Sequence, residues 1–115
     1  MREAGQIALL RFPQVDLVAG KLRPILLIAQ LRGRFEDWLV CMLSTQLNQA
    51  VLHFDEILDD SQDDFGASGL KVASVIRVSR LAVVSADMLI GATGQISPKR
   101  LARIKKALSD WIMTS

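Results

Sequence analysis

The sequence predicts a mainly β fold: a small, curled, mostly antiparallel sheet or open barrel with one amphipathic helix near the C-terminus packed on it. Three observations support this prediction. Short apolar segments recur between turn residues, residues 71–84 are rich in β-branched side chains, and the apolar period becomes helical after Ser97. At 115 residues the chain is large enough to bury one core, so a single domain over residues 1–115 is expected.

The first half of the chain carries three predicted strands, each rich in aliphatic residues and bounded by turn residues. The first covers residues 5–12 and is followed by a loop over residues 13–20, which contains proline, aspartate and glycine. A largely aliphatic run over residues 22–31 predicts a strand that is buried on both faces. After a turn at Gly33, a third strand is expected over residues 37–45, where the last residues are polar.

The second half of the chain continues this pattern less regularly. Residues 51–58 are interpreted as a fourth strand, and residues 61–69, which are acidic, polar and contain glycine, are interpreted as a loop. The β-branched stretch over residues 71–84 is long enough for one bent strand or two short ones. No internal repeat interrupts this order.

The last predicted element is an amphipathic helix of about four turns. Ser97 is a preferred N-cap residue, and Pro98 suits the first helical position. Arg100 stands where a capping box would carry an acid. Four apolar residues share one face of this helix, and five basic residues fill the other faces, which we interpret as solvated surface. They are Leu101, Ile104, Leu108 and Trp111, and Lys99, Arg100, Arg103, Lys105 and Lys106.

Composition indicates a globular protein whose charges are segregated. Hydrophobic residues make up 50% and charged residues 23% of the chain, and the mean hydropathy is +0.29. This hydropathy is high enough to expect that a second copy or a partner covers part of the surface. Six of the 12 acids lie within residues 55–64, whereas residues 35–70 contain no lysine or arginine. Such segregation suits a positive face for a polyanion, but ordinary solvated charge explains it equally well.

Several classes of function are not indicated. The apolar runs are far shorter than the ~18 residues of a membrane span, and a strand pattern begins directly after the N-terminus. We therefore expect no membrane insertion, no signal peptide and a cytoplasmic location. The sole cysteine, Cys41, offers neither a disulfide nor a zinc site, and the acidic block lacks the ligand pattern of a calcium loop, so no metal or other cofactor is expected. The sole histidine, His53, is interpreted as a strand residue without a catalytic role.

Two short polar segments remain as candidates for chemistry. Pro24 restricts Arg23 to an extended backbone at the mouth of the aliphatic strand, where a guanidinium offers a rigid fork of donors for a phosphate. The strand predicted over residues 37–45 ends in Ser44 and Thr45, and Gln46 follows it. Their hydroxyl and amide groups can orient a phosphodiester or a ribose hydroxyl. Each segment also has an ordinary explanation, as a surface ion pair or as strand-end hydroxyls that bond the backbone.

The order and spacing of these segments resemble the PemK/MazF family of toxin endoribonucleases. Five motifs carry the resemblance, which spans roughly residues 5–112. They are Gly5-Gln6-Ile7 with Arg11-Phe12-Pro13, Lys21-Leu22-Arg23-Pro24 before an aliphatic strand, Leu43-Ser44-Thr45-Gln46, the strand pair at residues 74–76 and 81–84, and Gly94-Gln95-Ile96-Ser97 before the helix.

The resemblance implies a toxin of a type II toxin–antitoxin system with an SH3-like β-barrel, usually a homodimer, that an antitoxin restrains with a flexible acidic segment. It implies metal-independent, sequence-specific cleavage of single-stranded RNA, including mRNA, by attack of a 2′-hydroxyl that leaves a cyclic phosphate. The implied catalytic residues are Arg23 and Ser44, with Thr45 as a neighbouring candidate. The implied RNA-binding residues are Lys21, Gln46, Arg77, Ser79 and Arg80.

Three features depart from the family pattern. Arg80 replaces an acid or amide that is common there, which either changes base preference or adds phosphate affinity. The loop over residues 14–20 is short, and residues 59–69 are unusually acidic, so we expect the acidic stretch to lie away from the RNA. The group that accepts the proton of the 2′-hydroxyl is left open, since an arginine is a very poor base.

Two other functions fit the same fold class. One is a gyrase poison of the CcdB type, and the other is a barrel that binds RNA or protein without cutting it. A cleft shared by Arg23 and Ser44 favours the nuclease, whereas side chains on opposite faces would exclude it.

Overall fold

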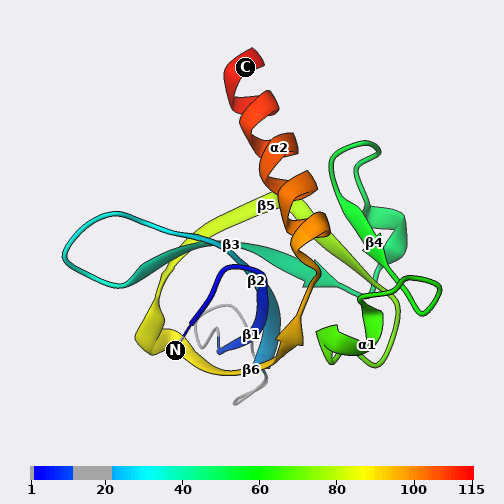
Figure 1. The fold of residues 1–115 in the computed structure, drawn as a ribbon, viewed down its shortest axis with the longest axis horizontal. Helices are drawn as coiled ribbons and strands as arrows, with labels where there is room; N and C mark the ends of the chain where they lie inside the picture. The colour runs from blue at the N-terminus through cyan, green and yellow to red at the C-terminus, as the bar shows by residue number, and fades with distance from the viewer. Residues whose placement is uncertain (1, 12–21) are drawn as a thin grey trace.

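A computed structural model describes residues 2–11 and 22–115 of the chain. In this part of the chain six strands form one antiparallel sheet in the order β4-β5-β3-β2-β1-β6, which confirms the predicted mainly β class. Figure 1 shows the sheet curling upon itself and the C-terminal helix rising away from it. The strands are β1 Gln6–Arg11, β2 Leu22–Gln30, β3 Asp37–Ser44, β4 Glu56–Leu58, β5 Ser74–Ser85 and β6 Leu89–Gln95. The helices are η1 Leu47–Gln49, α1 Phe65–Ser68, η2 Ala86–Met88 and α2 Pro98–Thr114.

The sheet separates two hydrophobic cores, and β2 contributes to both because its successive side chains point to opposite faces. Leu26 and Ile28 pack with Ile104 of α2 in one core, whereas Ile25 and Leu27 pack in the other core, inside the curl. These four strand residues are at most 2% exposed. The prediction that this strand is buried on both faces is therefore confirmed.

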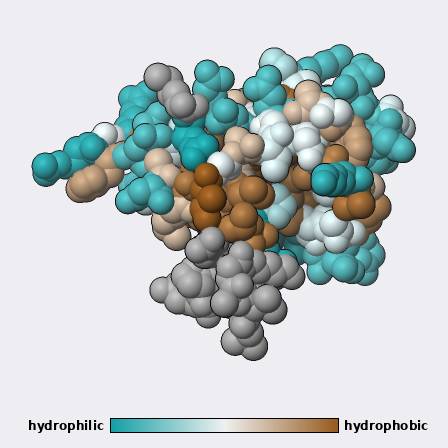
Figure 2. Space-filling view, turned by 90° about the horizontal axis from the view of Figure 1, so that it is seen from below, coloured by the Kyte–Doolittle hydropathy of each residue, from teal (hydrophilic) through white to brown (hydrophobic). Residues whose placement is uncertain are grey.

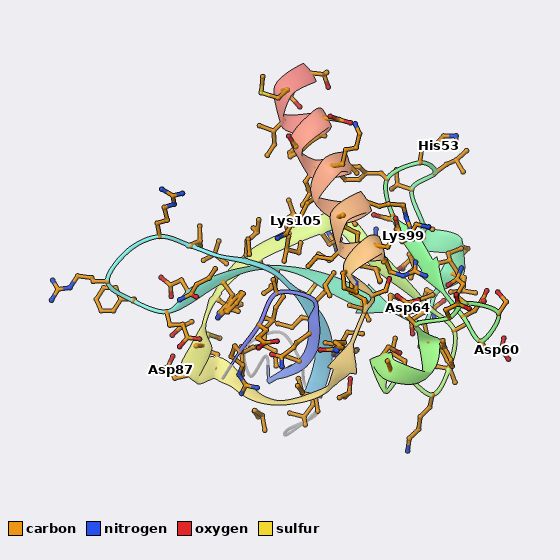
Figure 3. All side chains as sticks on the ribbon, in the orientation of Figure 1. His53, Asp60, Asp64, Asp87, Lys99 and Lys105 are labelled. Atoms are coloured by element: carbon orange, nitrogen blue, oxygen red, sulfur yellow. The ribbon has the colours of Figure 1, made fainter. Side chains whose placement is uncertain are left out.

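The structure differs from the prediction in three elements. Of the strand predicted over residues 51–58 only β4 forms, because residues 52–54 make a turn in which His53 adopts a positive φ of 65°. His53 is thus exposed in a loop rather than placed in a strand, and Figure 3 shows it pointing away from the sheet. The loop predicted over residues 61–69 contains the short helix α1. Strand β6 was not predicted, because its two glycines, alanine and threonine give little apolar alternation.

Strand β5 is one strand with a three-residue bulge, rather than two strands. Cys41 and Met42 are neighbours on β3, but their partners on β5 are Leu81 and Arg77. The three residues between Arg77 and Leu81 are therefore unpaired, and they are Val78, Ser79 and Arg80. A bulge bends a strand and re-aims its side chains, often beside an active site.

The interpretation of the basic helix face as solvated is wrong at Arg100. Arg100 is only 5% exposed, and its side chain forms salt bridges to Glu56 and Asp64. The other basic residues of the helix are exposed, so the correction concerns this position alone. Trp111, predicted on the apolar face, is 50% exposed and lies beside Phe54, with 6.2 Å between the ring centroids.

The outer surface also carries apolar residues. Figure 2, which views the molecule from below Figure 1, shows hydrophobic surface in the middle of that face with hydrophilic residues around it. Large side chains on β6 and α2 contribute exposed apolar area, with Ile90 at 51% and Met113 at 81% exposure. None of the helices in the described part of the chain combines the length and apolar character that a membrane crossing needs.

Candidate active site

Arg23 and Ser44 lie at adjoining ends of two neighbouring strands. The register of β2 with β3 ends at the pair of Ile25 and Met42, so Arg23 lies two residues before this pair on β2 and Ser44 lies two residues after it on β3. Arg23 is paired with Leu10 of β1, which holds its backbone. Because side chains alternate between the faces of a strand, Arg23 shares a face with Ile25, and Ser44 shares a face with Met42.

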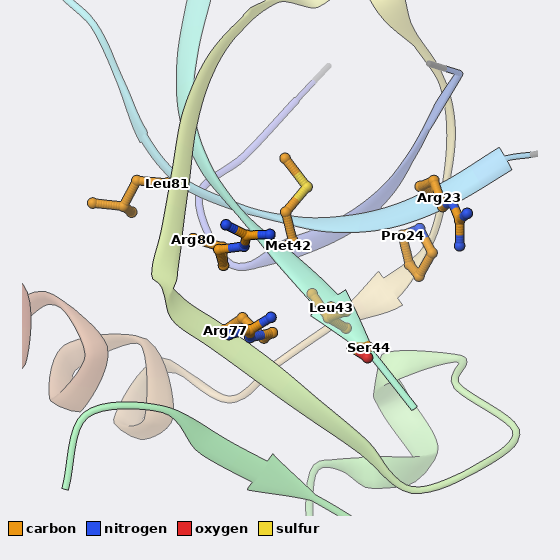
Figure 4. A pocket seen from close by; sticks show the side chains of 8 residues that line it. All are labelled: Arg23, Pro24, Met42, Leu43, Ser44, Arg77, Arg80 and Leu81. Atoms are coloured by element: carbon orange, nitrogen blue, oxygen red, sulfur yellow. The ribbon is translucent and has the colours of Figure 1, made fainter. Parts of the chain in front are cut away.

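A cleft lies over this pair, and three strands line it. It has a volume of about 470 Å³, within the usual range of about 300–1,000 Å³ for ligand pockets. Figure 4 shows how its lining side chains come from β2, β3 and β5. We call it the arginine cleft, and its lining residues are Arg23, Pro24, Met42, Leu43, Ser44, Arg77, Arg80 and Leu81. An adjoining hollow of about 340 Å³ shares Arg23, Pro24, Leu43 and Ser44 and extends the cleft to Thr45, Gln46 and Ser74.

The charge of the arginine cleft is positive. Arg23, Arg77 and Arg80 contribute guanidinium groups. None of the described residues that line the two parts of the cleft is acidic. Guanidinium groups form paired hydrogen bonds with phosphate oxygens, so the cleft is suited to a phosphodiester. The acidic residues 59–69 are absent from its described lining, in agreement with the expectation that they lie away from it.

The bulge of β5 is anchored by Asp55. Its Oδ1 accepts a hydrogen bond from the Ser79 backbone N–H at 2.9 Å, and its Oδ2 accepts one from the Ser79 hydroxyl at 3.0 Å. The same Oδ2 also accepts from the Val51 N–H at 2.9 Å. Asp55 therefore ties the segment before β4 to the bulge, between the two arginines that β5 places in the cleft.

Ser44 belongs to a hydrogen-bond network that includes Gln49 and Arg77. The Ser44 hydroxyl donates to Gln49 Oε1 at 3.2 Å and accepts from the Gln46 backbone N–H at 3.0 Å. Arg77 Nη1 donates to the same Gln49 Oε1 at 3.2 Å. Arg77 Nε is buried without a hydrogen-bond partner among the described residues, at a cost of about 1–3 kcal/mol.

The structure brings together six of the eight residues that the sequence suggested for the site. Arg23, Ser44, Thr45, Gln46, Arg77 and Arg80 line the two parts of the cleft. Ser79 lies on the bulge but not in the lining, and its hydroxyl is bonded to Asp55. Lys21 lies outside the residues that the structure describes.

Sequence reasoning missed Gln49 and Asp55. Gln49 follows the polar strand end closely enough to be noticed, but its contact with Arg77 spans 28 positions and depends on the turn η1. Asp55 was counted only as part of an acidic block, whereas its partner Ser79 is 24 positions away.

Other reactive side chains are not placed for chemistry. Cys41 is buried, and this burial, together with the charge of Asp55, raises the pKa of its thiol to about 12, so the thiolate nucleophile is not available at neutral pH. Within residues 2–11 and 22–115, no three His, Cys, Asp or Glu side chains are grouped as a metal site requires.

Comparisons with known proteins agree with this fold. The Mycobacterium tuberculosis toxin MazF-mt6 is similar in structure, with a TM-score of 0.65 and 16% identity over 91% of this chain and 93% of that one. An endoribonuclease from a mycobacterial species, solved in complex with its cognate antitoxin, has a TM-score of 0.68 and 17% identity over 100% of this chain and 98% of that one. No curated protein sequence matches the chain.

The family comparison reaches further than the fold. The pattern of the PemK-like, MazF-like toxins of type II toxin–antitoxin systems matches residues 3–112, nearly the whole chain. This match includes the strand that carries Arg23, the strand end at Ser44 and the C-terminal helix. The chain therefore belongs to the family of PemK-like, MazF-like toxins of type II toxin–antitoxin systems.

Proposed function

We propose that this toxin is an endoribonuclease that cuts single-stranded RNA, including mRNA, at short sequences and without a metal ion. The observation that carries the proposal is that Arg23 and Ser44 line one cleft together with two further arginines. One of the mycobacterial proteins of the same fold is an endoribonuclease, which gives support at the level of the family.

The reaction is an internal transfer within the RNA. The 2′-hydroxyl oxygen attacks the adjacent phosphorus, the bond from phosphorus to the 5′-oxygen breaks, and a cyclic phosphate and a 5′-hydroxyl result. The proton of the 2′-hydroxyl is lost, and the leaving oxygen gains a proton. Arg23 stabilises the charge that develops on the phosphate oxygens, a role that suits the rigid fork of donors of a guanidinium group. Ser44 holds the reacting groups in line, and Thr45 lies next to it.

The remaining cleft residues bind the RNA on both sides of the reacting phosphate. Arg77 and Arg80 supply phosphate contacts from β5, and Gln46 extends the surface beyond the end of β3. Lys21 and Ser79 complete the proposed RNA-binding set. With three arginines, the cleft also attracts RNA at long range and does so less at high salt.

The proposal includes two protein partners and a location. A relative of the same fold was solved with its cognate antitoxin, and an acidic, flexible antitoxin segment would complement the positive cleft of this chain. A second copy of the chain would form a homodimer, which the exposed apolar residues of the surface support. The toxin would act in the cytoplasm, where its substrate mRNA is found.

The test is cleavage of a varied single-stranded RNA in EDTA, with identification of the product ends. The intact chain is expected to produce cyclic phosphate ends, and Arg23→Ala is expected to abolish cleavage. Arg32→Ala, which removes an exposed arginine in the loop between β2 and β3, is the matched control and should cut as the intact chain does. A folded, antitoxin-free chain that leaves RNA intact would contradict the proposal, and a gyrase supercoiling assay would then test the CcdB-type alternative.

A further inference from the structure

The carbonyl oxygen of Gln49 determines the direction of the Ser44 hydroxyl. Gln49 Oε1 lies 3.2 Å from Arg77 Nη1 and 3.2 Å from Ser44 Oγ. An arginine guanidinium can only donate hydrogen bonds, so the Gln49 atom that faces Arg77 must be the oxygen and not the amide nitrogen. That oxygen can only accept. The Ser44 hydroxyl must therefore direct its proton toward Gln49.

This leaves Ser44 with a single unused hydrogen-bonding position. A serine hydroxyl has one donor hydrogen and two acceptor lone pairs. The hydrogen is taken by Gln49, and one lone pair accepts from the Gln46 backbone N–H at 3.0 Å. The position that remains is an acceptor, so a ligand in the arginine cleft must offer Ser44 a donor.

The two groups of RNA that react differ in this respect. The non-bridging oxygens of a phosphodiester only accept hydrogen bonds, whereas the ribose 2′-hydroxyl carries a hydrogen that it can donate. Arg23, Arg77 and Arg80 supply donors for the phosphate in the same cleft. The hydrogen-bonding capacities therefore match the phosphate oxygens with the arginines and the 2′-hydroxyl with Ser44.

We propose that Gln49 is a positioning residue that holds Ser44 as an acceptor for the ribose 2′-hydroxyl, so that the cleft selects ribose by its donor hydrogen. Ser44 orients the attacking oxygen through this hydrogen bond, and no covalent bond to Ser44 forms or breaks. The inference rests on the proposed ribonuclease function of the same cleft. It specifies that Ser44 binds the 2′-hydroxyl and not the phosphate.

The short turn η1 explains how Gln49 reaches this place. The Gln49 N–H donates to the Gln46 carbonyl at 3.0 Å, and the Ala50 N–H donates to the Leu47 carbonyl at 3.2 Å. These tight turns fold the chain back directly after β3, so the Gln49 side chain returns to the end of that strand. The bond to Arg77 then joins the turn to β5.

The inference is tested by binding, with RNA and with 2′-fluoro RNA of the same sequence as probes. The fluoro substituent keeps the ribose pucker but has no hydrogen to donate. All proteins carry Arg23→Ala so that the RNA is not consumed during the measurement. We expect this background to bind RNA more tightly than 2′-fluoro RNA by roughly two- to twelvefold, the range that one net hydrogen bond supplies.

Substitutions at Gln49 then separate orientation from folding. Gln49→Leu should reduce the preference for RNA, because without its fixed acceptor the Ser44 hydroxyl can also turn its hydrogen toward the ligand. Gln49→Glu should keep the preference, because a carboxylate still accepts from both Ser44 and Arg77. Ser44→Ala should abolish the preference, and adding Gln49→Leu to it should change nothing further.

The outcomes distinguish this inference from the proposed function. If Gln49→Leu keeps the full preference for RNA while its circular dichroism spectrum is unchanged, the inference is wrong even if the intact chain cuts RNA. If the preference is reduced in Gln49→Leu and kept in Gln49→Glu, the inference holds. It would then describe ribose recognition even if the intact chain failed to cut.

Discussion

Arg100 and Asp64 are joined by two parallel hydrogen bonds, from Nε to Oδ2 at 2.8 Å and from Nη2 to Oδ1 at 3.0 Å. The same Oδ2 accepts a hydrogen bond from the backbone N–H of Ser97, the N-cap residue of α2, at 3.0 Å. In a capping box, an acid three positions after the N-cap accepts this N–H. Here that position holds Arg100. The N–H is accepted instead by Asp64, the residue before α1, to which Arg100 is bound.

The pair is part of a larger buried group. Arg100 Nη1 donates to Glu56 at 2.7 Å, and Nη2 also donates to Gln62 at 3.1 Å. Arg100 and Asp64 are only 5% and 8% exposed. Removing one partner of such a pair typically costs about 3–5 kcal/mol, because the other charge stays buried without compensation. The group joins β4, the α1 segment and α2.

The first prediction concerns stability in acid. Hydrogen bonds from Arg100 lower the pKa of Asp64 from 3.8 to about 2, against the effect of its burial. Because the folded-state pKa is the lower one, the unfolded chain binds more protons in this range. The stabilisation is therefore complete above about pH 4 and is lost as the pH falls toward 2, by about 2 kcal/mol in total. Urea unfolding between pH 2 and 6 should show this loss.

Two variants check the origin of the acid effect. Asp64→Asn should be less stable at pH 7 by about 3 kcal/mol, and it should lose the part of the pH dependence that belongs to this carboxyl. Asp60→Asn removes an exposed aspartate four residues earlier and should behave as the intact chain does. An acid profile that is the same for Asp64→Asn and the intact chain would show that the pair does not cause it.

The second prediction concerns the contact of β6 with α1. A Cβ added to Gly94 would overlap the backbone oxygen of Ala67 and lie 2.6 Å from the Ser68 carbonyl carbon. Backbone atoms cannot move aside as a flexible side chain can, so Gly94→Ala should destabilise the fold by about 3 kcal/mol. Gly91→Ala is the matched control in the same strand, since a Cβ there would meet nothing within 4 Å. Thermal unfolding should show a large decrease in Tm for the first variant and little change for the second.

The sequence was informative where a single local pattern determines the structure. The aliphatic run around Ile25 and the Ser97-Pro98 helix start specify their elements without help from distant residues. Short β6 was missed because its formation depends on pairing with β1, which local composition does not indicate. His53 was wrongly placed in a strand. It lies in a turn that brings the Asp55 carboxylate to the Val51 N–H, and local composition does not indicate this turn.

The site shows the same division between local and distant information. Arg23 and Ser44 were singled out by their local segments, and the family resemblance led to the prediction that they share a cleft. Their supporting partners could not be predicted, because the bonds from Gln49 and Asp55 to β5 span 28 and 24 positions. The buried state of Arg100 was missed for a similar reason, as its acceptors Asp64 and Glu56 lie 36 and 44 positions away.

The third prediction concerns Asp55 and the bulge of β5. Asparagine has one acceptor oxygen, so Asp55→Asn cannot accept all three hydrogen bonds that the carboxylate accepts from Ser79 and Val51. The Ser79 amide hydrogen should then exchange with solvent at least about tenfold faster, which corresponds to one lost hydrogen bond to a charged group. Asp63→Asn removes an exposed aspartate elsewhere and should leave this exchange rate unchanged. Equal exchange in both variants would mean that the bulge does not depend on Asp55.

The fourth prediction separates the two arginines of β5 by their effects on RNA binding. Each phosphate contact to a single strand contributes about −0.7 to the slope of log affinity against log salt concentration. Arg77→Ala and Arg80→Ala should each make the slope less steep by about this amount, measured in the Arg23→Ala background. Arg32→Ala, outside the described cleft lining, should not change the slope.

The two variants should differ in the discrimination of RNA from 2′-fluoro RNA. Arg77 donates to Gln49 Oε1 and so fixes the direction of the Ser44 hydroxyl, whereas no such bond joins Arg80 to Gln49 among the described residues. Arg77→Ala should therefore weaken phosphate binding and also reduce the preference for RNA. Arg80→Ala should weaken phosphate binding alone. If both variants keep the preference, Arg77 acts only through its charge and the Ser44 hydroxyl is oriented without it.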